Sequence, residues 1–208
     1  MTYQLIEVQS ENVSDDIVQK IKVFCQHALD ENKHEARQNM QIENWQDCPS
    51  SLLYILLVEK RFKAQNGGLT LLMSDHSIIA VSGYYRSDFD SKIFIMGVRS
   101  WVLKKYRFNL LIAKHLIPYQ FNKIKEMNGH TAAMTFNEAT KSFAFLIQRS
   151  NKNLEITNKF FFGKEYPDIY KDMILISEPL KIKNVKQWVL IKKISASNFD
   201  WSVLTWNI

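Results

Sequence analysis

Apolar and polar residues in the first part of the chain follow two different spacings. Residues 3–8 have the sequence Tyr-Gln-Leu-Ile-Glu-Val, and this short run rich in aromatic and β-branched residues predicts a first strand. From residue 15 the apolar residues recur every three or four positions, which predicts an amphipathic helix over 15–30 with Ser14 as its N-cap. Cys25 lies on the apolar face of this helix, so we interpret it as an inert core thiol.

A polar stretch separates this helix from a second one. Residues 31–47 contain few apolar side chains and are predicted to form a loop, with room for a short helical turn. Pro49 suits a first helical position, and leucines at helical spacing extend the second helix to about residue 64. Asn66-Gly67-Gly68 is predicted to end it.

The middle of the chain predicts an antiparallel three-stranded meander. Apolar runs over 69–73, 78–85 and 92–103 are separated by short polar connections, as in consecutive hairpins. Gly97 lies inside the third run, where a glycine indicates a bulge or a close approach, or else a simple packing accommodation.

The remainder alternates helices and strands. Residues 107–127 return to helical spacing, and Pro118 among them is expected to kink or split that helix. The later predicted elements are a strand over 130–136, a helix from Asn137 to about Arg149, and strands over 173–177 and 185–194. The predicted order is β-α-α-β-β-β-α-β-α-β-β, an α+β fold with a mixed, mostly antiparallel sheet flanked by helices.

The composition fits one globular domain. The chain has 208 residues, of which 46% are hydrophobic and 23% charged, and it shows no repeat and no flexible linker. We therefore predict a single domain over 1–208 with an aromatic tail at 195–208. The tail carries Phe199, Trp201 and Trp206, which are expected to pack on the domain or on a neighbouring subunit, so a homodimer stays open.

Several classes of protein are excluded. The only cysteines, Cys25 and Cys48, have no Cys or His partner at finger spacing, so neither a disulfide scaffold nor a metal site is expected. The longest apolar stretch, 52–58, is too short to span a bilayer, and the N-terminus lacks a basic region followed by an apolar one, so we expect a cytoplasmic protein without membrane insertion. Nucleophile-elbow and phosphate-loop motifs are absent.

Charge is unevenly distributed along the chain. Residues 1–100 contain 10 Lys and Arg against 13 Asp and Glu, a balance of −3, whereas residues 101–208 contain 17 against 8, a balance of +9. A basic half favours an anionic partner, such as a phosphorylated cofactor, nucleic acid or an acidic surface. Lysines that merely keep the surface soluble explain the same excess.

One segment links the third predicted strand to the following helix. Residues 102–112 have the sequence Val-Leu-Lys-Lys-Tyr-Arg-Phe-Asn-Leu-Leu-Ile. In this segment and in element order the chain resembles the GNAT superfamily of N-acetyltransferases, over roughly residues 5–194. In that family an Arg or Gln opens a glycine-containing loop leading into the helix that binds the coenzyme A pyrophosphate. Arg107 matches the Arg, but Leu110 and Ile112 stand where the family has glycines.

A second segment carries the same resemblance. Residues 135–145 have the sequence Thr-Phe-Asn-Glu-Ala-Thr-Lys-Ser-Phe-Ala-Phe and look like the family's strand-to-helix segment, entered at Asn137. Many members carry a Tyr as general acid where this chain has Ala144. Members without that Tyr exist, so its absence leaves the activity possible.

The resemblance implies an N-acyltransferase that uses acetyl-coenzyme A or another acyl-coenzyme A and acts on a small-molecule or peptide amine. Glu59 and His130 are the candidate catalytic bases, because an ammonium group must lose a proton before it attacks the thioester. Asn109 also suits the cap of the helix. The residues implied in cofactor binding are Val102, Leu103, Arg107, Phe108, Asn109, Leu110, Leu111, Ile112 and Asn137.

Two other functions remain open. A catalytically degenerate protein of the same fold, serving in interactions, is favoured by the missing glycines and the missing Tyr. A basic nucleic-acid-binding protein is supported by the +9 half and its aromatic residues. The aromatics, however, fall mostly on apolar periodicities typical of core residues.

Overall fold

The computed structural model describes residues 2–36, 48–88, 90–109, 111–137, 174–175, 180–182 and 185–194. The chain falls into two compact units. The first unit consists of Met1–Arg86 and Met96–Lys123, and the second of Ser87–Ile95 and Ile124–Ile208. Strand β4 contributes its first three residues to the second unit and the rest to the first.

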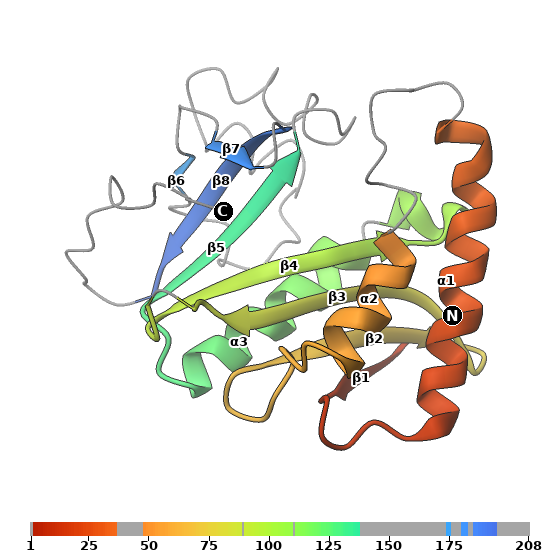
Figure 1. The fold of residues 1–208 in the computed structure, drawn as a ribbon, viewed down its shortest axis with the longest axis horizontal. Coiled ribbons are helices and arrows are strands. Elements are labelled where there is room, and N and C mark those ends of the chain that lie inside the picture. The colour runs from red at the N-terminus through yellow and green to blue at the C-terminus, as the bar shows by residue number, and fades with distance from the viewer. Residues whose placement is uncertain are drawn as a thin grey trace. The chain divides into compact units, whose positions relative to one another are not determined.

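The first unit contains the predicted meander. Its strands are β1 (Gln4–Val8), β2 (Gly67–Ser74), β3 (Ser77–Arg86) and β4 (Ile93–Val102), which lie side by side in that order (Figure 1). β2 is antiparallel to both β1 and β3. Asp75 and His76 form the β2–β3 turn with φ of 49° and 67°, the left-handed pair typical of a two-residue hairpin. The predicted turn at 74–77 is confirmed.

Helix α1 (Asp15–Ala36) is longer than predicted. It begins where expected, but residues 31–36 continue it, so the prediction of a loop from residue 31 is wrong for these residues. They have the sequence Glu-Asn-Lys-His-Glu-Ala, without glycine or proline and with several good helix formers. The apolar stripe stops at this point although the helix does not.

Helix α2 (Cys48–Leu57) is shorter than predicted. Lys60 adopts a left-handed φ of 50°, and the backbone then turns so that Phe62 becomes fully buried. The N–H of Ser10 donates to the Phe62 carbonyl at 2.7 Å and fixes that turn. The prediction that Gly67 and Gly68 end this helix is wrong, because these two residues begin β2.

Two apolar layers enclose the sheet of the first unit, with α1 and α2 in front of it and α3 behind it in Figure 1. The α1–α2 layer packs on residues of β1, β2 and β3 that include Val8, Leu69, Leu71 and Val81. The opposite layer joins Leu72, Ile79 and Ala80 to Leu111 and Leu116. A register shift after Leu72 leaves Ile79 without a partner in β2 and lets Ile79 and Ala80 share one layer. Cys25 is buried in the α1–α2 layer, which confirms that it lies on the apolar face of α1.

The segment after β4 is three short helices instead of the single helix predicted over 107–127. They are a 3₁₀ helix (Lys104–Asn109), a π-helix (Ile112–Leu116) and α3 (Ile117–Glu126). The Ile117 N–H donates to the Ile112 carbonyl, five residues back. Pro118 follows at once, and since proline offers no N–H and crowds the preceding turn, the wide turn suits it. Pro118 was expected to kink or split the helix, and the structure shows that the regular α-helical hydrogen bonding is interrupted directly before it.

The second unit continues the sheet from the start of β4. Ile93–Ile95 pair in parallel with Thr131–Ala133 of β5 (Thr131–Asn137). β5 is antiparallel to β8 (Val185–Lys193), which also pairs with β6 (Ile174–Leu175) and β7 (Leu180–Ile182). The predicted strands over 130–136 and 185–194 are therefore confirmed within a residue or two, and the one predicted over 173–177 is confirmed at Ile174–Leu175, where the structure describes it. β7 was not predicted.

Some predictions lie outside the described residues. These are the loop over 37–47, the helix over 138–149, the polar segment 150–171 and the tail 195–208. Asn137 itself is the last residue of β5. Among the helices in the described ranges, none is both long and apolar enough to cross a membrane.

Candidate functional site

Strand β4 bends in the middle of its length. Gly97 has a φ of 73° and Arg99 a φ of 53°, both in the left-handed region that glycine adopts most easily. Side chains bind both polar backbone groups of Gly97: its N–H donates to Gln120 Oε1 at 3.1 Å, and its carbonyl accepts from Ser100 Oγ at 2.8 Å. The backbone of β4 is therefore irregular at Gly97, where the sequence predicted a bulge or a close approach, or else a simple packing accommodation.

The carboxyl end of β4 leads directly into the basic segment. The Leu103 N–H donates to the Ile79 carbonyl at 3.0 Å, and the Tyr106 N–H donates to the Leu103 carbonyl at 2.8 Å. The chain therefore leaves the sheet at Leu103 and begins a helical turn at once. Val102 and Leu103, both implied in cofactor binding, are half-buried at this exit.

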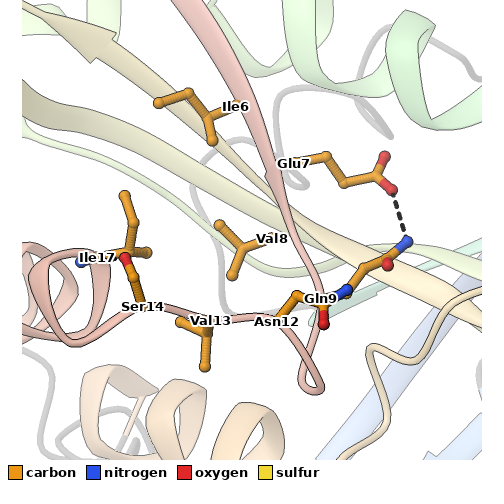
Figure 2. Close-up of a pocket in the computed structure, with 8 residues that line it drawn as sticks. All are labelled: Ile6, Glu7, Val8, Gln9, Asn12, Val13, Ser14 and Ile17. Atoms are coloured by element: carbon orange, nitrogen blue, oxygen red, sulfur yellow. Dashed lines mark hydrogen bonds between the residues drawn. The ribbon is translucent and has the colours of Figure 1, made fainter.

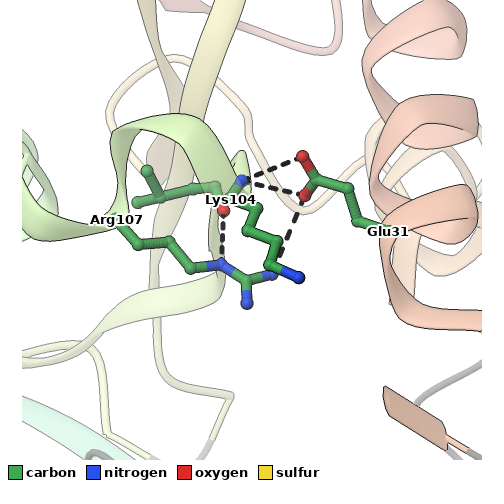
Figure 3. A network of polar contacts seen from close by, with 4 residues as sticks. Glu31, Lys104 and Arg107 are labelled. Atoms are coloured by element: carbon green, nitrogen blue, oxygen red, sulfur yellow. Dashed lines mark hydrogen bonds and ion pairs between the residues drawn. The ribbon is translucent and has the colours of Figure 1, made fainter. Parts of the chain in front are cut away.

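Arg107 is held against the end of the strand by three contacts. Its Nε donates to the Val102 carbonyl at 3.1 Å, and its guanidinium carbon lies 5.2 Å from the centre of the Trp101 ring. Its Nη2 lies 3.8 Å from Glu31 Oε2 on α1 (Figure 3). The side chain is 33% exposed, so the guanidinium is oriented while part of it still faces solvent.

Glu31 binds the start of the same segment. Both of its carboxylate oxygens accept the Lys104 N–H, each at 2.9 Å. A backbone N–H beside a guanidinium is also a donor set that phosphate oxygens use. The exit of β4 thus has donors that meet at one anionic group, and in this structure that group is Glu31.

The residues that follow Arg107 pack more tightly than glycines would. Leu111 is 1% exposed, and Ile112 packs against the apolar layer of Leu72 and Ile79. Leu111, rather than Asn109, occupies the N-cap of the π-helix, without a side-chain cap. Asn109 is the last residue of the 3₁₀ helix, and its Nδ2 donates to Tyr3 Oη at 3.4 Å, so a helix cap by its Oδ1 stays a prediction. The side chain of Phe108 and all of Leu110 lie outside the described residues.

The surroundings of this segment are mostly cationic. Lys104, Lys105 and Lys114 are exposed, and the carboxylate of Glu31 contacts the Lys104 N–H and Arg107 (Figure 3). Burial and the nearby Lys114 lower the pKa of His115, which favours its neutral form. The His115 ring meets Tyr3 edge-on, with the ring centroids 5.6 Å apart.

The candidate bases belong to different units. Glu59 follows α2 in the first unit, where its exposed carboxylate accepts from Arg61 Nε at 2.7 Å. His130 lies at the start of β5 in the second unit and is half-buried. Its backbone N–H donates to the Lys92 carbonyl at 2.8 Å, and its carbonyl accepts from the Ile194 N–H at 2.7 Å. Asn137 also belongs to the second unit, and Arg107 to the first.

Sequence reasoning missed two polar residues near β4, Glu31 and Gln120. Glu31 lies beyond the apolar stripe of α1, which gave no reason to expect a contact with residue 104. The sequence does contain a signal for Gln120. It stands at helical spacing from Leu116, Ile117 and Ile124, so it is a polar residue within an apolar stripe. A polar residue at such a position indicates a buried hydrogen-bond network.

A cavity of about 430 Å³ lies where β1 leads into α1 (Figure 2). Two of its polar side chains are hydrogen-bonded within the protein, since Glu7 accepts from Gln9 Nε2 at 3.4 Å and from the Tyr84 hydroxyl at 3.1 Å. No residue implied in cofactor binding or catalysis lines it. The lining residues are Ile6, Glu7, Val8, Gln9, Asn12, Val13, Ser14 and Ile17.

Comparisons with known proteins bear on the fold. No family model matches the sequence, and no curated protein matches it either. Solved structures do match. A GNAT-family acetyltransferase from Staphylococcus aureus has a TM-score of 0.55 and 15% identity, and one from Streptococcus pneumoniae has 0.56 and 10%; both matches cover 93% of this chain and 100% of the other.

A third similar structure comes from Salmonella typhimurium. It is an acetyl transferase that modifies the N-terminal serine of a 50S ribosomal subunit protein, with a TM-score of 0.56 and 9% identity over 93% of this chain and 96% of that one. At these identities the similarity concerns the fold. Together with the α+β topology and the bent β4, it shows that this chain has the fold of the GNAT acetyltransferases.

Proposed function

We propose that this protein is an acyl-coenzyme A-dependent N-acyltransferase that transfers an acetyl or related acyl group to an amine. The observation that carries the proposal is the exit of β4, where Arg107 and the Lys104 N–H are oriented toward one anionic group. The GNAT fold supports the same reading. A small molecule or a peptide is the acceptor we propose, and the setting we propose is cytoplasmic.

The residues around Arg107 fit a diphosphate. Arg107 would hold it by charge, and backbone N–H groups over 108–112 would add hydrogen bonds. Leu111 is buried in the apolar layer and the partly buried Ile112 packs against it, so these two residues keep their own backbone in place although they lack the freedom of glycine. Val102 would pair in strand fashion with the pantetheine arm, whereas the N–H and the carbonyl of Leu103 are already bound to Ile79 and Tyr106. Asn137 remains a residue that we propose to take part in cofactor binding. When bound, the acyl-coenzyme A supplies the activated thioester.

The reaction needs one proton taken and one given. An ammonium acceptor loses one proton to a base, its nitrogen attacks the thioester carbonyl, and the C–S bond breaks. The nitrogen then loses a second proton, and the leaving thiolate gains one, so that the products are an amide, a thiol and one released proton. Glu59 and His130 are our candidates for accepting the first proton. Glu59 would have to release Arg61 to do so.

Titration calorimetry with acetyl-coenzyme A tests the proposal directly. We expect micromolar binding by the protein, weakened about tenfold to a hundredfold in Arg107→Ala, because a charged hydrogen bond contributes about 1.5–3 kcal/mol. Arg86→Ala is the matched control: Arg86 also donates to a backbone carbonyl, that of Gln65 at 3.1 Å, but at the opposite end of β3 from the β4 exit. The affinity of Arg86→Ala for acetyl-coenzyme A should equal that of the unchanged protein. Absence of binding at millimolar cofactor would reject the acyltransferase.

Replacing Glu31 with glutamine is expected to tighten acetyl-coenzyme A binding by about two- to tenfold. The carboxylate repels a diphosphate and shares its donors, and a partly exposed charge contributes about 1 kcal/mol at such separations. Calorimetry at low and high salt measures the change, which should shrink as salt rises. Glu11→Gln, an exposed change in the same unit, is the control. Weaker binding in Glu31→Gln would instead mean that Glu31 orients Arg107 for the cofactor.

Two observations favour a second candidate, a non-catalytic protein of the same fold that serves in interactions. Ile112 is part of the packed layer where the family has glycine, and Glu31 already binds the donors at the β4 exit. This alternative predicts that neither the unchanged protein nor Glu31→Gln binds acetyl-coenzyme A. Partner capture, with nucleic acid tested at several salt concentrations, would then be the next step.

A further inference from the structure

A polar side chain of α3 is fully buried beneath the sheet of the first unit. Gln120 is 0% exposed and lies on the same buried face as the apolar residues Leu116 and Ile117. A buried carboxamide without partners would cost several kcal/mol. Its hydrogen bonds therefore show what it does in this position.

All the hydrogen-bonding groups of Gln120 are directed at the strands. Oε1 accepts the Gly97 N–H at 3.1 Å, while Nε2 donates to Thr70 Oγ1 and to the Ser82 carbonyl, both at 2.9 Å. Because a backbone N–H can only donate, the oxygen of the carboxamide must face Gly97. The side chain thus connects β2, β3 and the bend of β4 in one fixed orientation.

Serines hold the other side of the bend. Ser100 Oγ donates to the Gly97 carbonyl at 2.8 Å and lies 2.7 Å from Ser82 Oγ. Thr70 and Ser82 are register partners, and the Thr70 hydroxyl donates to the Ser82 carbonyl. Gly97 is therefore fixed at its N–H by Gln120 and at its carbonyl by Ser100.

We propose that Gln120 is a positioning residue, which fixes the bend at Gly97 and so sets the direction of the β4 backbone between Gly97 and Val102. The proposal rests on the proposed function, in which this end of β4 pairs with the pantetheine arm. An extended ligand recognised by backbone hydrogen bonds requires the strand groups to point correctly. Loss of the carboxamide releases Gly97 while leaving the contacts of Arg107 intact.

The first test concerns the bend alone and needs no cofactor. The chain has only six glycines, so labelling glycine with ¹⁵N gives few amide signals, and the Gly97 signal is the one lost in Gly97→Ala. In Gln120→Met we expect exchange of the Gly97 amide to accelerate by about a hundredfold or more, because its buried acceptor is gone. In Gln120→Glu a carboxyl oxygen still accepts this N–H, so protection should largely return. Asn122→Met, an exposed change on the same helix, should leave it unaltered.

The second test separates positioning from general destabilisation. Acetyl-coenzyme A is compared with 3′-phosphoadenosine 5′-diphosphate, which lacks the pantetheine arm. In Gln120→Met we expect acetyl-coenzyme A to bind about tenfold more weakly and the nucleotide to change by less than about twofold. Equal losses for both ligands would show a merely structural role and overturn the proposal, as would unchanged Gly97 exchange. If the unchanged protein binds neither ligand, the proposed function fails, and the role of Gln120 in binding the pantetheine arm fails with it. The exchange test still decides whether Gln120 fixes the Gly97 amide.

Discussion

Replacing Gly67 with alanine is expected to lower the free energy of unfolding by about 3 kcal/mol or more, one of the largest single effects in the first unit. Gly67 opens β2 opposite Tyr85 of β3. A Cβ at Gly67 would lie 2.2 Å from the Tyr84 carbonyl oxygen and 2.7 Å from Tyr85 Cα. These are backbone atoms of a paired strand, so they cannot move aside unless β2 and β3 separate.

Urea unfolding of Gly67→Ala measures this cost, with Gly68→Ala as the matched control. A Cβ at Gly68 would lie 2.9 Å from two atoms of the Glu7 side chain, which is half-buried and can adopt another rotamer. Gly68→Ala should therefore lower the free energy of unfolding by only about 1–2 kcal/mol, clearly less than Gly67→Ala does. Equal midpoints for the two variants would contradict the packing of β2 against β3 described above.

The strands of the first unit were readable from the sequence because their determinants are local. Runs of apolar residues separated by Ser-Asp-His-Ser and by a second polar turn predict a meander, and the structure contains it. Gly97 was also informative, since a glycine inside an apolar run indicates an irregular backbone. The resemblance to GNAT proteins then placed these strands in one fold.

The ends of the helices were not readable in the same way. α1 continues through residues 31–36, which lack apolar spacing but also lack any helix breaker. α2 ends before its apolar pattern does, because Phe62 is drawn into the core and its carbonyl is bound by the Ser10 N–H. Gly67 and Gly68 resemble a helix stop, yet their small size serves close strand packing. Tertiary contacts decide these points, and the local sequence does not encode them.

The polar contacts of the candidate site escaped prediction for a similar reason. Arg107 was found through its place in a family motif, and its segment indeed follows β4. Its neighbour Glu31 comes from α1, and Gln120 reaches Gly97 across a helix–sheet interface. Only the fold brings such distant residues together, so one sequence can suggest the cofactor segment but not the side chains that orient it.

Gly83 and Phe62 should be strongly coupled in a double-mutant cycle. A Cβ at Gly83 would lie 2.6 Å from both Cε1 and Cζ of the Phe62 ring, and this ring is fully buried in the α1–α2 layer. Gly83→Ala alone should therefore lower the free energy of unfolding by about 2–3 kcal/mol through overpacking. Phe62→Leu alone should cost about 1–2 kcal/mol, because it removes ring atoms from the same layer.

The two changes together should cost less than the sum of the single effects by about 1 kcal/mol or more, since the leucine leaves room for the new methyl group. Urea unfolding of the four proteins gives the coupling energy. Val81→Ala combined with Gly83→Ala is a suitable comparison, because Val81 lies in the same layer but is absent from the atoms nearest to a Cβ at Gly83. Additive effects in the Phe62 cycle would mean that the Phe62 ring does not cover Gly83. If only the Phe62 cycle shows coupling, Gly83 is required because it leaves room for the Phe62 ring. Burial of this ring would then explain why the chain turns after α2 and leads into β2.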